Sequence, residues 1–375
     1  MRTLITLILA ILCSTSIALA DTYTGTTGDC TYTLDTDEGM LVISGIGAMA
    51  DYTSSTNASP WRDYYSDIKT VTIEDGVTNI GEYAFYNCTS LTNVTIGSGV
   101  TSIGDYAFEY CSSLTSITIP DGVTSIGQYA FAHCKTSITS VTIGSGVTSI
   151  GDYAFYDCTG LTNITVSEGN TAYVSVDGVL YTYDMTVLIC YPAQKTDTSY
   201  TIPDSVKKIY DYAFEYCSYL TSITIPESVT SIGLYAFNGC TSLTILTSLA
   251  TTPPTIYSST CRTIYEQATL YVTSEAYETY STAEFWKNFT NIVVYSTSGS
   301  NDVSSVAAST SAISTAGSAI IITTEAAQTA QVYSLAGQLI VKQAVASGET
   351  TIGMPAGGVY VVVLDDGTKA KVSVK

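Results

Sequence analysis

The chain has 375 residues, enough for two or three domains, and 46% of them are apolar, which suits packed cores and excludes a disordered protein. Its formal charge is −20, from 33 acidic and 13 basic residues. This balance repels phosphate backbones and anionic lipid, so we expect no nucleic-acid partner. The acids are scattered singly, which is typical of a solvated surface.

The first 20 residues have the three parts of a secretory signal peptide. A positive charge at Arg2 precedes an apolar run, Leu4–Leu12, and the segment ends in the small-x-small sequence Ala18-Leu19-Ala20. We expect cleavage between Ala20 and Asp21. The apolar run is shorter than the ~20 residues of a membrane span. A lipoprotein signal at Cys13 is the weaker alternative, and no later segment is apolar enough to predict a transmembrane segment in the mature chain.

Residues 71–245 repeat a short pattern. Aligning the sequence Ala-Phe gives intervals of 23, 23, 24, 59 and 23 residues between Phe85, Phe108, Phe131, Phe155, Phe214 and Phe237. Within one unit, Leu114, Ile117 and Ile119 alternate with polar residues as in a strand, and the apolar residues up to Cys134 then follow at spacings of three to four. A fixed period of ~20–30 residues is typical of a solenoid. We predict a parallel strand ladder with short helical or turn returns.

The repeated sequences Leu-x-x-Ile-x-Ile-Pro, Val-Thr-Ser-Ile-Gly and Tyr-Ala-Phe-x-x-Cys closely resemble the BspA-like (Treponema-type) leucine-rich repeat family, over about residues 70–245. The resemblance implies a leucine-rich repeat solenoid on the cell surface that adheres to host matrix protein or to other cells. Residues 21–70, with the sequence SPWRDYYSDIK, resemble the family's N-terminal cap. Residues 246–295 resemble the closing cap, with Trp286 and Phe289 available to cover the last coil.

The interval of 59 residues contains an insertion. Residues of about 168–200 hold alternating apolar positions around Asp177-Gly178, which predicts a β-hairpin with a primed turn. A similar insertion is seen in proteins of the same family.

The C-terminal part has a different pattern. Residues 296–318 are mostly Ser, Thr, Ala and Gly, which predicts a linker. Residues 319–375 have strand-like runs and an Asp366-Gly367 turn, which predict a small β-sandwich.

The C-terminal sequences VYSLAGQLI, PAGGVYVVVLDDG and KAKVSVK resemble the sorting domain of type IX secretion cargo. The matching positions are Gly337, Gly358, Tyr360 and Lys371. The resemblance implies recognition by the type IX secretion machinery and a location at the bacterial outer-membrane surface or outside the cell. A β-module with only a structural role is the alternative.

Six of the ten cysteines share one repeat position, three residues after the repeated phenylalanine: Cys88, Cys111, Cys134, Cys158, Cys217 and Cys240. A buried cysteine acts as a small apolar residue, so we predict free, stacked thiols here. Cys30, Cys190 and Cys261 lie outside this series, and the sequence leaves their pairing open.

The sequence predicts no catalytic, cofactor or metal site. His133 is the only histidine and lies at a variable repeat position, so no Ser-His-Asp arrangement is expected, and zinc at His133 and Cys134 would need two more ligands. Asp35, Asp37 and Glu38 lack the spacing of a calcium loop and predict a turn. A carboxylate pair for glycan cleavage is not identifiable but stays open.

Two ladders of side chains are candidate contact surfaces. Strand positions that point away from the core form a predicted ligand face of Asn93, Thr95, Ser116, Thr118, Ser140, Thr142, Asn163, Thr165, Ser222 and Thr224. A second ladder comprises Tyr83, Tyr106, Tyr129, Tyr153, Tyr212 and Tyr235. Strand propensity and repeat duplication explain the same residues without a ligand. Tyrosine is nevertheless common in contact surfaces.

We therefore predict a secreted surface protein that binds a host or bacterial surface protein or glycan, and no enzyme. A passive envelope or spacer protein without a ligand is the alternative. A glycan-active enzyme is the least favoured interpretation.

Overall fold

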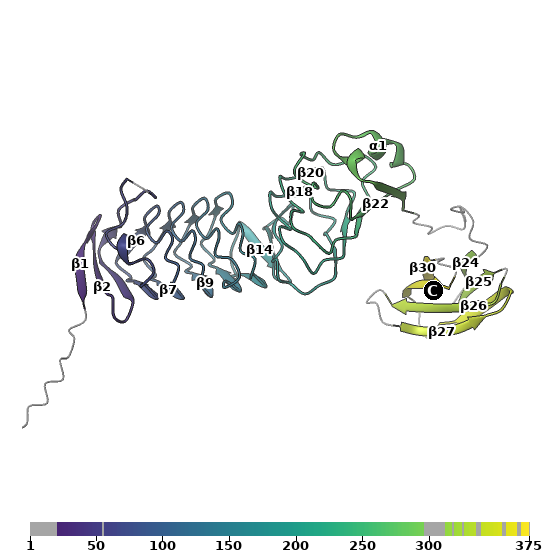
Figure 1. Ribbon diagram of the computed structural model, residues 1–375, viewed down its shortest axis with the longest axis horizontal. Helices are drawn as coiled ribbons and strands as arrows, with labels where there is room; N and C mark the ends of the chain where they lie inside the picture. The colour runs from purple at the N-terminus through teal and green to yellow at the C-terminus, as the bar shows by residue number, and fades with distance from the viewer. Residues whose placement is uncertain are drawn as a thin grey trace, which may run out of the picture. The chain divides into compact units, whose positions relative to one another are not determined.

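A computed structural model describes residues 21–54, 56–295, 312–316, 319–324, 326–334, 339–354, 358–365 and 369–374. The predicted signal peptide, Gly337 and the Asp366-Gly367 turn lie outside these residues. The chain divides into two compact units, residues 1–295 and 296–375 (Figure 1).

The first unit is a parallel β-solenoid (Figure 1). On one side its coils contribute the strands β5 (Thr70–Ile73), β7 (Asn93–Ile96), β9 (Ser116–Ile119), β11 (Ser140–Ile143) and β13 (Asn163–Val166). A second side holds the shorter strands β6 (Val77–Ile80), β8 (Ser102–Ile103), β10 (Ser125–Ile126) and β12 (Ser149–Ile150). β9 and β11 pair with Thr118 opposite Thr142, so equivalent residues of successive coils lie side by side. The predicted solenoid is confirmed.

The returns between strands are turns rather than helices. Tyr106 has a φ of 59°, a left-handed conformation that ends a helix, and the equivalent tyrosines of the other coils share it. Alternate amides of this segment bond to the next coil, and those between them bond within their own turn. Tyr106 N donates to Gln128 O at 2.9 Å, and Phe108 N donates to Ala130 O at 2.8 Å. Each coil therefore needs its neighbour to satisfy its backbone.

Threonine hydroxyls join the coils in two further rows. Thr115 Oγ1 donates to Thr92 O at 3.2 Å, and Thr139 Oγ1 donates to Thr115 O at 3.3 Å. On another edge, Thr124 Oγ1 donates to Thr101 O at 3.0 Å. Thr115 and Thr139 precede the long strands β9 and β11, and Thr124 precedes the short strand β10. Their hydroxyls stabilise the stack by joining neighbouring coils.

The N-terminal end is covered by an antiparallel cap. β1 (Thr22–Thr27), β2 (Cys30–Asp35) and β3 (Met40–Gly45) pair in order, and β3 continues in parallel to β5; the two-residue β4 (Gly47–Ala48) joins β6. After these strands comes the 3₁₀ turn η1 (Arg62–Tyr64). Trp61 is fully buried, stacks on Phe85 at 5.7 Å and donates Nε1–H to Ala84 O at 2.8 Å. Trp61 thereby closes the first coil.

An insertion interrupts the stack after β13. β14 (Tyr173–Val176) and β15 (Val179–Thr182) form an antiparallel hairpin whose turn residues, Asp177 and Gly178, both have positive φ. β16 (Val187–Cys190) pairs with β15 and then, in parallel, with β18 (Lys208–Ile209) of the next regular coil. The apolar core of the unit is accordingly divided into two clusters, one before and one after this junction.

The coils after the junction rebuild both sides of the solenoid. β17 (Ser199–Thr201), β19 (Ser222–Ile225), β21 (Ile245–Ser248), β22 (Thr269–Val272) and β23 (Asn291–Val294) form one parallel sheet, while β20 (Ser231–Ile232) extends the other. The closing segment adds α1 (Tyr277–Thr282) and η2 (Trp286–Asn288). Trp286 and Phe289 are buried there, and Trp286 donates to Pro254 O at 2.8 Å.

The second unit consists of two antiparallel sheets around one core, as the sequence predicts. One sheet contains β24 (Ala312–Ala316), β25 (Ala319–Thr324) and β28 (Gly348–Gly353), and the other β26 (Gln328–Ser334), β27 (Leu339–Val345), β29 (Gly358–Leu364) and β30 (Lys369–Val374). β24 begins within the segment predicted as a linker. Among the described residues of the chain, no helix has the length and apolar character needed to cross a membrane.

Candidate functional site

The ten residues of the predicted ligand face point outward on the long strands. Ile117 and Ile119 of β9 are buried, whereas Ser116 and Thr118, which alternate with them, are exposed. Parallel pairing aligns Ser116 with Ser140 and Thr118 with Thr142. Within the described chain, the hydroxyls of Thr95, Thr118 and Thr142 form no hydrogen bond with protein atoms. The hydroxyls of Thr92, Thr115 and Thr139, in contrast, each donate to a carbonyl of the preceding coil. The hydroxyls of Thr95, Thr118 and Thr142 are thus available to an outside partner, whereas Thr165 Oγ1 already accepts a hydrogen bond from Asn163 Nδ2 at 2.9 Å.

The predicted face is split at the junction. Along β13, Ile164 N donates to Gly178 O at 3.1 Å and Val166 N to Ser175 Oγ at 3.0 Å, so the inserted hairpin lies where another parallel strand would pair. Eight of the ten residues precede this point, and Ser222 and Thr224 belong to the separate sheet beyond it. The structure therefore pairs the members on β9, β11 and β13 in one sheet, with Asn93 and Thr95 on β7 at the edge of the preceding sheet, and places the last two on a second surface.

The tyrosine ladder is a stack of rings, half-buried except for the exposed Tyr235. Tyr83 and Tyr106 lie 4.6 Å apart, and Tyr106 and Tyr129 lie 5.2 Å apart with an angle of only 8° between their planes. Beyond the junction, Tyr212 and Tyr235 stack again at 5.2 Å. Tyr153 and Tyr212 break the pattern, because their rings meet edge to face at 81°. Much of each ring is therefore used for stacking on the neighbouring coils.

The cysteines form a further internal row. All nine described cysteines are free, and all except Cys190 are buried. Cys111 Sγ lies 3.3 Å from Phe85 O, and Cys240 Sγ lies 3.0 Å from Phe214 O, so each thiol donates weakly to the preceding coil. Burial raises the pKa of Cys88 far above that of a free thiol. The prediction of free, stacked thiols is confirmed, and Cys30, Cys190 and Cys261 are also unpaired.

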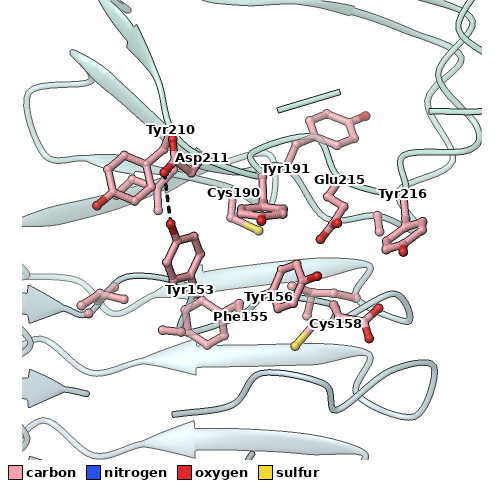
Figure 2. Close-up of a pocket in the computed structure, with 18 of the residues that line it drawn as sticks. Tyr153, Phe155, Tyr156, Cys158, Cys190, Tyr191, Tyr210, Asp211, Glu215 and Tyr216 are labelled. Carbon is pink, nitrogen blue, oxygen red and sulfur yellow. Dashed lines mark hydrogen bonds between the residues drawn. The ribbon is translucent and has the colours of Figure 1, made fainter. Parts of the chain in front are cut away.

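A cavity of about 240 Å³ lies at the junction of the two core clusters. One wall is the coil of Tyr153, Phe155 and Tyr156, and the opposite wall carries Asp211 and Glu215 (Figure 2). In an intact stack the amides of one coil bond to carbonyls of the next. Within the described chain, no hydrogen bond between two backbone groups joins residues 153–157 to residues 212–216, and Tyr153 Oη donates to Asp211 Oδ2 at 3.4 Å.

Glu215 is the most perturbed carboxyl group at this junction. Its side chain is only 8% exposed, accepts a hydrogen bond from Asn238 Nδ2 at 3.0 Å, and is also reached by the amide of Asp157. Burial raises the pKa of Glu215 to about 7. The same hexapeptide, Tyr-Ala-Phe-Glu-Tyr-Cys, occurs inside the intact stack, where Glu109 is equally buried but lies 4.0 Å from His133.

His133 has a structural setting. It stacks on Tyr110 at 4.5 Å and bonds to Asp157 Oδ2 through Nδ1 at 2.8 Å. Across the described residues, no group of three or more His, Cys, Asp or Glu side chains is arranged to hold a metal ion. The acidic sequence at Asp35 is a turn, since Asp35 Oδ1 accepts the amides of Asp37 and Glu38 at 3.0 Å.

Three of the four sorting positions lie in the described part of the second unit. Gly358 and Tyr360 belong to β29 and Lys371 to β30. Tyr360 is buried, and Val361 pairs with Lys371 across the two strands.

The solenoid geometry agrees with comparison to known proteins. A family model of the BspA-type leucine-rich repeat region matches residues 63–175 and 193–302, in six copies. The chain belongs to this family. Its relatives are leucine-rich repeat proteins, a group that functions in protein–protein interaction and at surfaces and is typically without enzymatic activity. The curated proteins contain no match to this BspA-type chain.

Solved structures of other proteins are similar to the chain. A leucine-rich repeat protein from Eubacterium ventriosum is 30% identical, with 72% of this chain and 85% of that chain covered and a TM-score of 0.51. A leucine-rich cell surface protein from Faecalibacterium prausnitzii is 26% identical over 74% of this chain and 96% of that chain, with a TM-score of 0.38. The pneumococcal vaccine antigen PcpA is 19% identical over 73% and 99%, with a TM-score of 0.41.

Sequence reasoning missed the junction cavity and the role of Asn170 at the start of the insertion. Asn170 is buried and donates from Nδ2 to Gly144 O at 2.9 Å and to Val147 O at 3.0 Å, while its Oδ1 accepts the amides of Ala172 and Tyr173. It anchors the start of the insertion. The available signal was the interval of 59 residues, which marks where the regular stack must change.

Proposed function

We propose that this BspA-type protein is an adhesin that binds a protein or glycan of a host or of another cell through its strand face. The observation that carries the proposal is the register of β9, β11 and β13, which aligns Thr118, Thr142 and Thr165 in one row of outward hydroxyl groups. An extended polar row offers many weak, repeated hydrogen bonds to an extended ligand. Family membership supports an interaction role of this kind.

The experiment measures binding of the full chain to an array of matrix proteins and glycans. The test variant carries Thr118→Lys and Thr142→Lys, which place two bulky cations on the face. The control is Glu227→Lys, which adds the same two units of charge at an exposed turn after β19. We expect saturable binding that the double variant loses and the control keeps. Folded protein that binds no ligand saturably would favour the passive envelope role instead.

We also infer that the chain is exported and reaches the cell surface by the type IX route. The signal-like N-terminus and the C-terminal sequences with Gly358, Tyr360 and Lys371 support this inference. Deletion of residues 319–375 should leave the protein inside the outer membrane of a host strain with this secretion machinery. Unchanged surface display of the deleted chain would refute the route without bearing on adhesion by the solenoid.

A further inference from the structure

The junction joins two series of coils, and on the side of the long strands it does so through the backbone. The first series ends at β13, and the second begins with β18 on one side of the solenoid and β17 on the other. Ile164 N of β13 donates to Gly178 O at 3.1 Å, and Gln194 N donates to Leu161 O at 2.8 Å. The hairpin strands β14 and β15 lie in one sheet with β16, β18 and β20 of the second series. Backbone hydrogen bonds therefore connect the two series on this strand side.

On the opposite side, where the left-handed turns lie, the connection depends on side chains. Within the described chain, the backbone groups of the two facing turns form no hydrogen bond with one another, and the cavity lies between them. Two side-chain bonds cross this turn side. Tyr153 Oη donates to Asp211 Oδ2 at 3.4 Å, and Tyr210 Oη donates to Asp152 Oδ1 (Figure 2). Each series thus contributes one tyrosine and one aspartate.

The sequence itself changes where the close packing of turns ends. The coils of the first series have a glycine after the short strand, as in Ile126-Gly127, and a Cβ at Gly127 would lie 2.5 Å from Asp105 N of the preceding coil. Only glycine allows this approach. At the junction the equivalent residue is Tyr210, which follows Ile209. A tyrosine is accommodated there because the preceding coil no longer approaches so closely.

We propose that the junction is a hinge, at which the two series of coils bend relative to each other by opening the turn side about the strand side. Opening breaks the two tyrosine–aspartate bonds, the bond from the Asp157 amide to Glu215, and the edge-to-face contacts of Tyr153 and Tyr156 with Tyr212. It breaks no hydrogen bond between two backbone groups of the facing turns. A segment held by so few contacts is where a fold opens first.

The hinge sets the angle between the two surfaces of outward strand residues. Thr118 and Thr142 lie on the first series, and Ser222 and Thr224 lie on the second. Bending changes the orientation of one surface relative to the other without altering the register within either. The hinge depends only on the bonding at the junction and not on a ligand of the strand face.

Distance measurement between nitroxide labels by pulsed electron paramagnetic resonance tests the hinge in the full chain. One pair, Lys135→Cys with Thr241→Cys, spans the turn side, and a second, Ser116→Cys with Ile245→Cys, spans the strand side; all four positions are exposed. Wild-type protein treated with the same label gives the background from the native thiols. We expect a broad or two-peaked distance distribution for the turn-side pair and a narrow one for the strand-side pair. Narrow distributions for both pairs, or equal broadening of both, would overturn the proposal.

A double variant tests whether the crossing bonds hold the hinge closed. Tyr153→Phe with Tyr210→Phe removes both hydroxyl groups and keeps the rings, so the fraction of long turn-side distances should at least double while the strand-side distances stay unchanged. Tyr106→Phe with Tyr129→Phe is the matched control inside the intact stack and should change neither distribution. Circular dichroism verifies that each variant is folded. An unchanged turn-side distribution in the folded double variant would refute the assignment of these bonds as the closure and overturn the hinge.

Discussion

Replacing Glu215 by glutamine should stabilise the solenoid at high pH and not at low pH. Burial raises the pKa of this carboxyl group from an ordinary 4.5 to about 7, so the folded chain favours the protonated form. At about 1.4 kcal/mol per pH unit, this difference in pKa corresponds to at most ~3.5 kcal/mol. The penalty is absent below pH 4.5, grows as the pH rises and is complete above pH 7. It applies only to the ionised carboxylate.

The net effect is smaller because glutamine has one fewer acceptor oxygen. Asn238 Nδ2 and the Asp157 amide both donate to the carboxylate, and loss of one such bond costs about 1 kcal/mol. We therefore expect Glu215→Gln to raise the free energy of unfolding by ~2 kcal/mol at pH 8.

Urea unfolding of both proteins at pH 4.5, 6 and 8 measures the difference. The contributions of the other titrating groups are the same in the two proteins and cancel. The difference in free energy of unfolding should therefore increase steadily with pH. In the matched variant Glu109→Gln, burial also raises the pKa of the carboxyl group, but nearby His133 opposes the shift, and we expect a weaker trend. A Glu215→Gln difference that is flat between pH 4.5 and 8, or that falls with pH, would refute the reasoning.

Three further predictions concern the stack itself. Phe131→Ala should lower the free energy of unfolding by about 3–5 kcal/mol, and Phe155→Ala should lower it by clearly less because Phe155 already borders a cavity. Equal losses for the two variants in urea unfolding would contradict the interruption of the stack at the junction. Thr115→Val should cost about 1 kcal/mol of stability in the same assay and Thr118→Val under ~0.5, since only Thr115 bonds to another coil. Ellman titration of native protein at pH 8 should detect at most one of the nine described thiols within minutes, since the others are buried and burial raises the pKa even of the half-buried Cys190 to about 12. Fast reaction of several thiols would contradict free burial, and fewer than nine thiols after denaturation would reveal disulfides.

The solenoid and its core could be predicted because burial imposes a period on the sequence. Strand alternation at Ile117 and Ile119 and the spacing of Phe131 and Cys134 each state which side chains face inward. The left-handed turns were harder, since positive φ is usually signalled by glycine. One signal was present. The position of His133 is occupied by Asn87, Asp157 and Gly239 in other coils, and these residue types tolerate that conformation.

The sequence predicts the strand face but not the junction cavity, and the difference has a physical reason. Outward strand residues such as Thr118 follow directly from alternation. The junction cavity depends on which strand β16 pairs with after the insertion, and a long-range pairing of this kind leaves no local pattern in the sequence. Glu109 and Glu215 illustrate the limit, because identical hexapeptides acquire different surroundings from what lies on the next coil.

The rows of threonine hydrogen bonds affect how easily the solenoid can gain or lose coils. Thr115, Thr139 and their equivalents each bond to the carbonyl one coil earlier, whichever coil that is. A duplicated or deleted coil would therefore find its hydrogen-bond partners already in place, and gene-level gain or loss of whole repeats is structurally tolerated on either side of the junction. The junction itself pairs unlike residues, such as Tyr153 with Asp211, 58 positions apart. The residues of the junction must therefore be kept together. The series of coils before the junction and the series after it can each vary in length while the junction is kept.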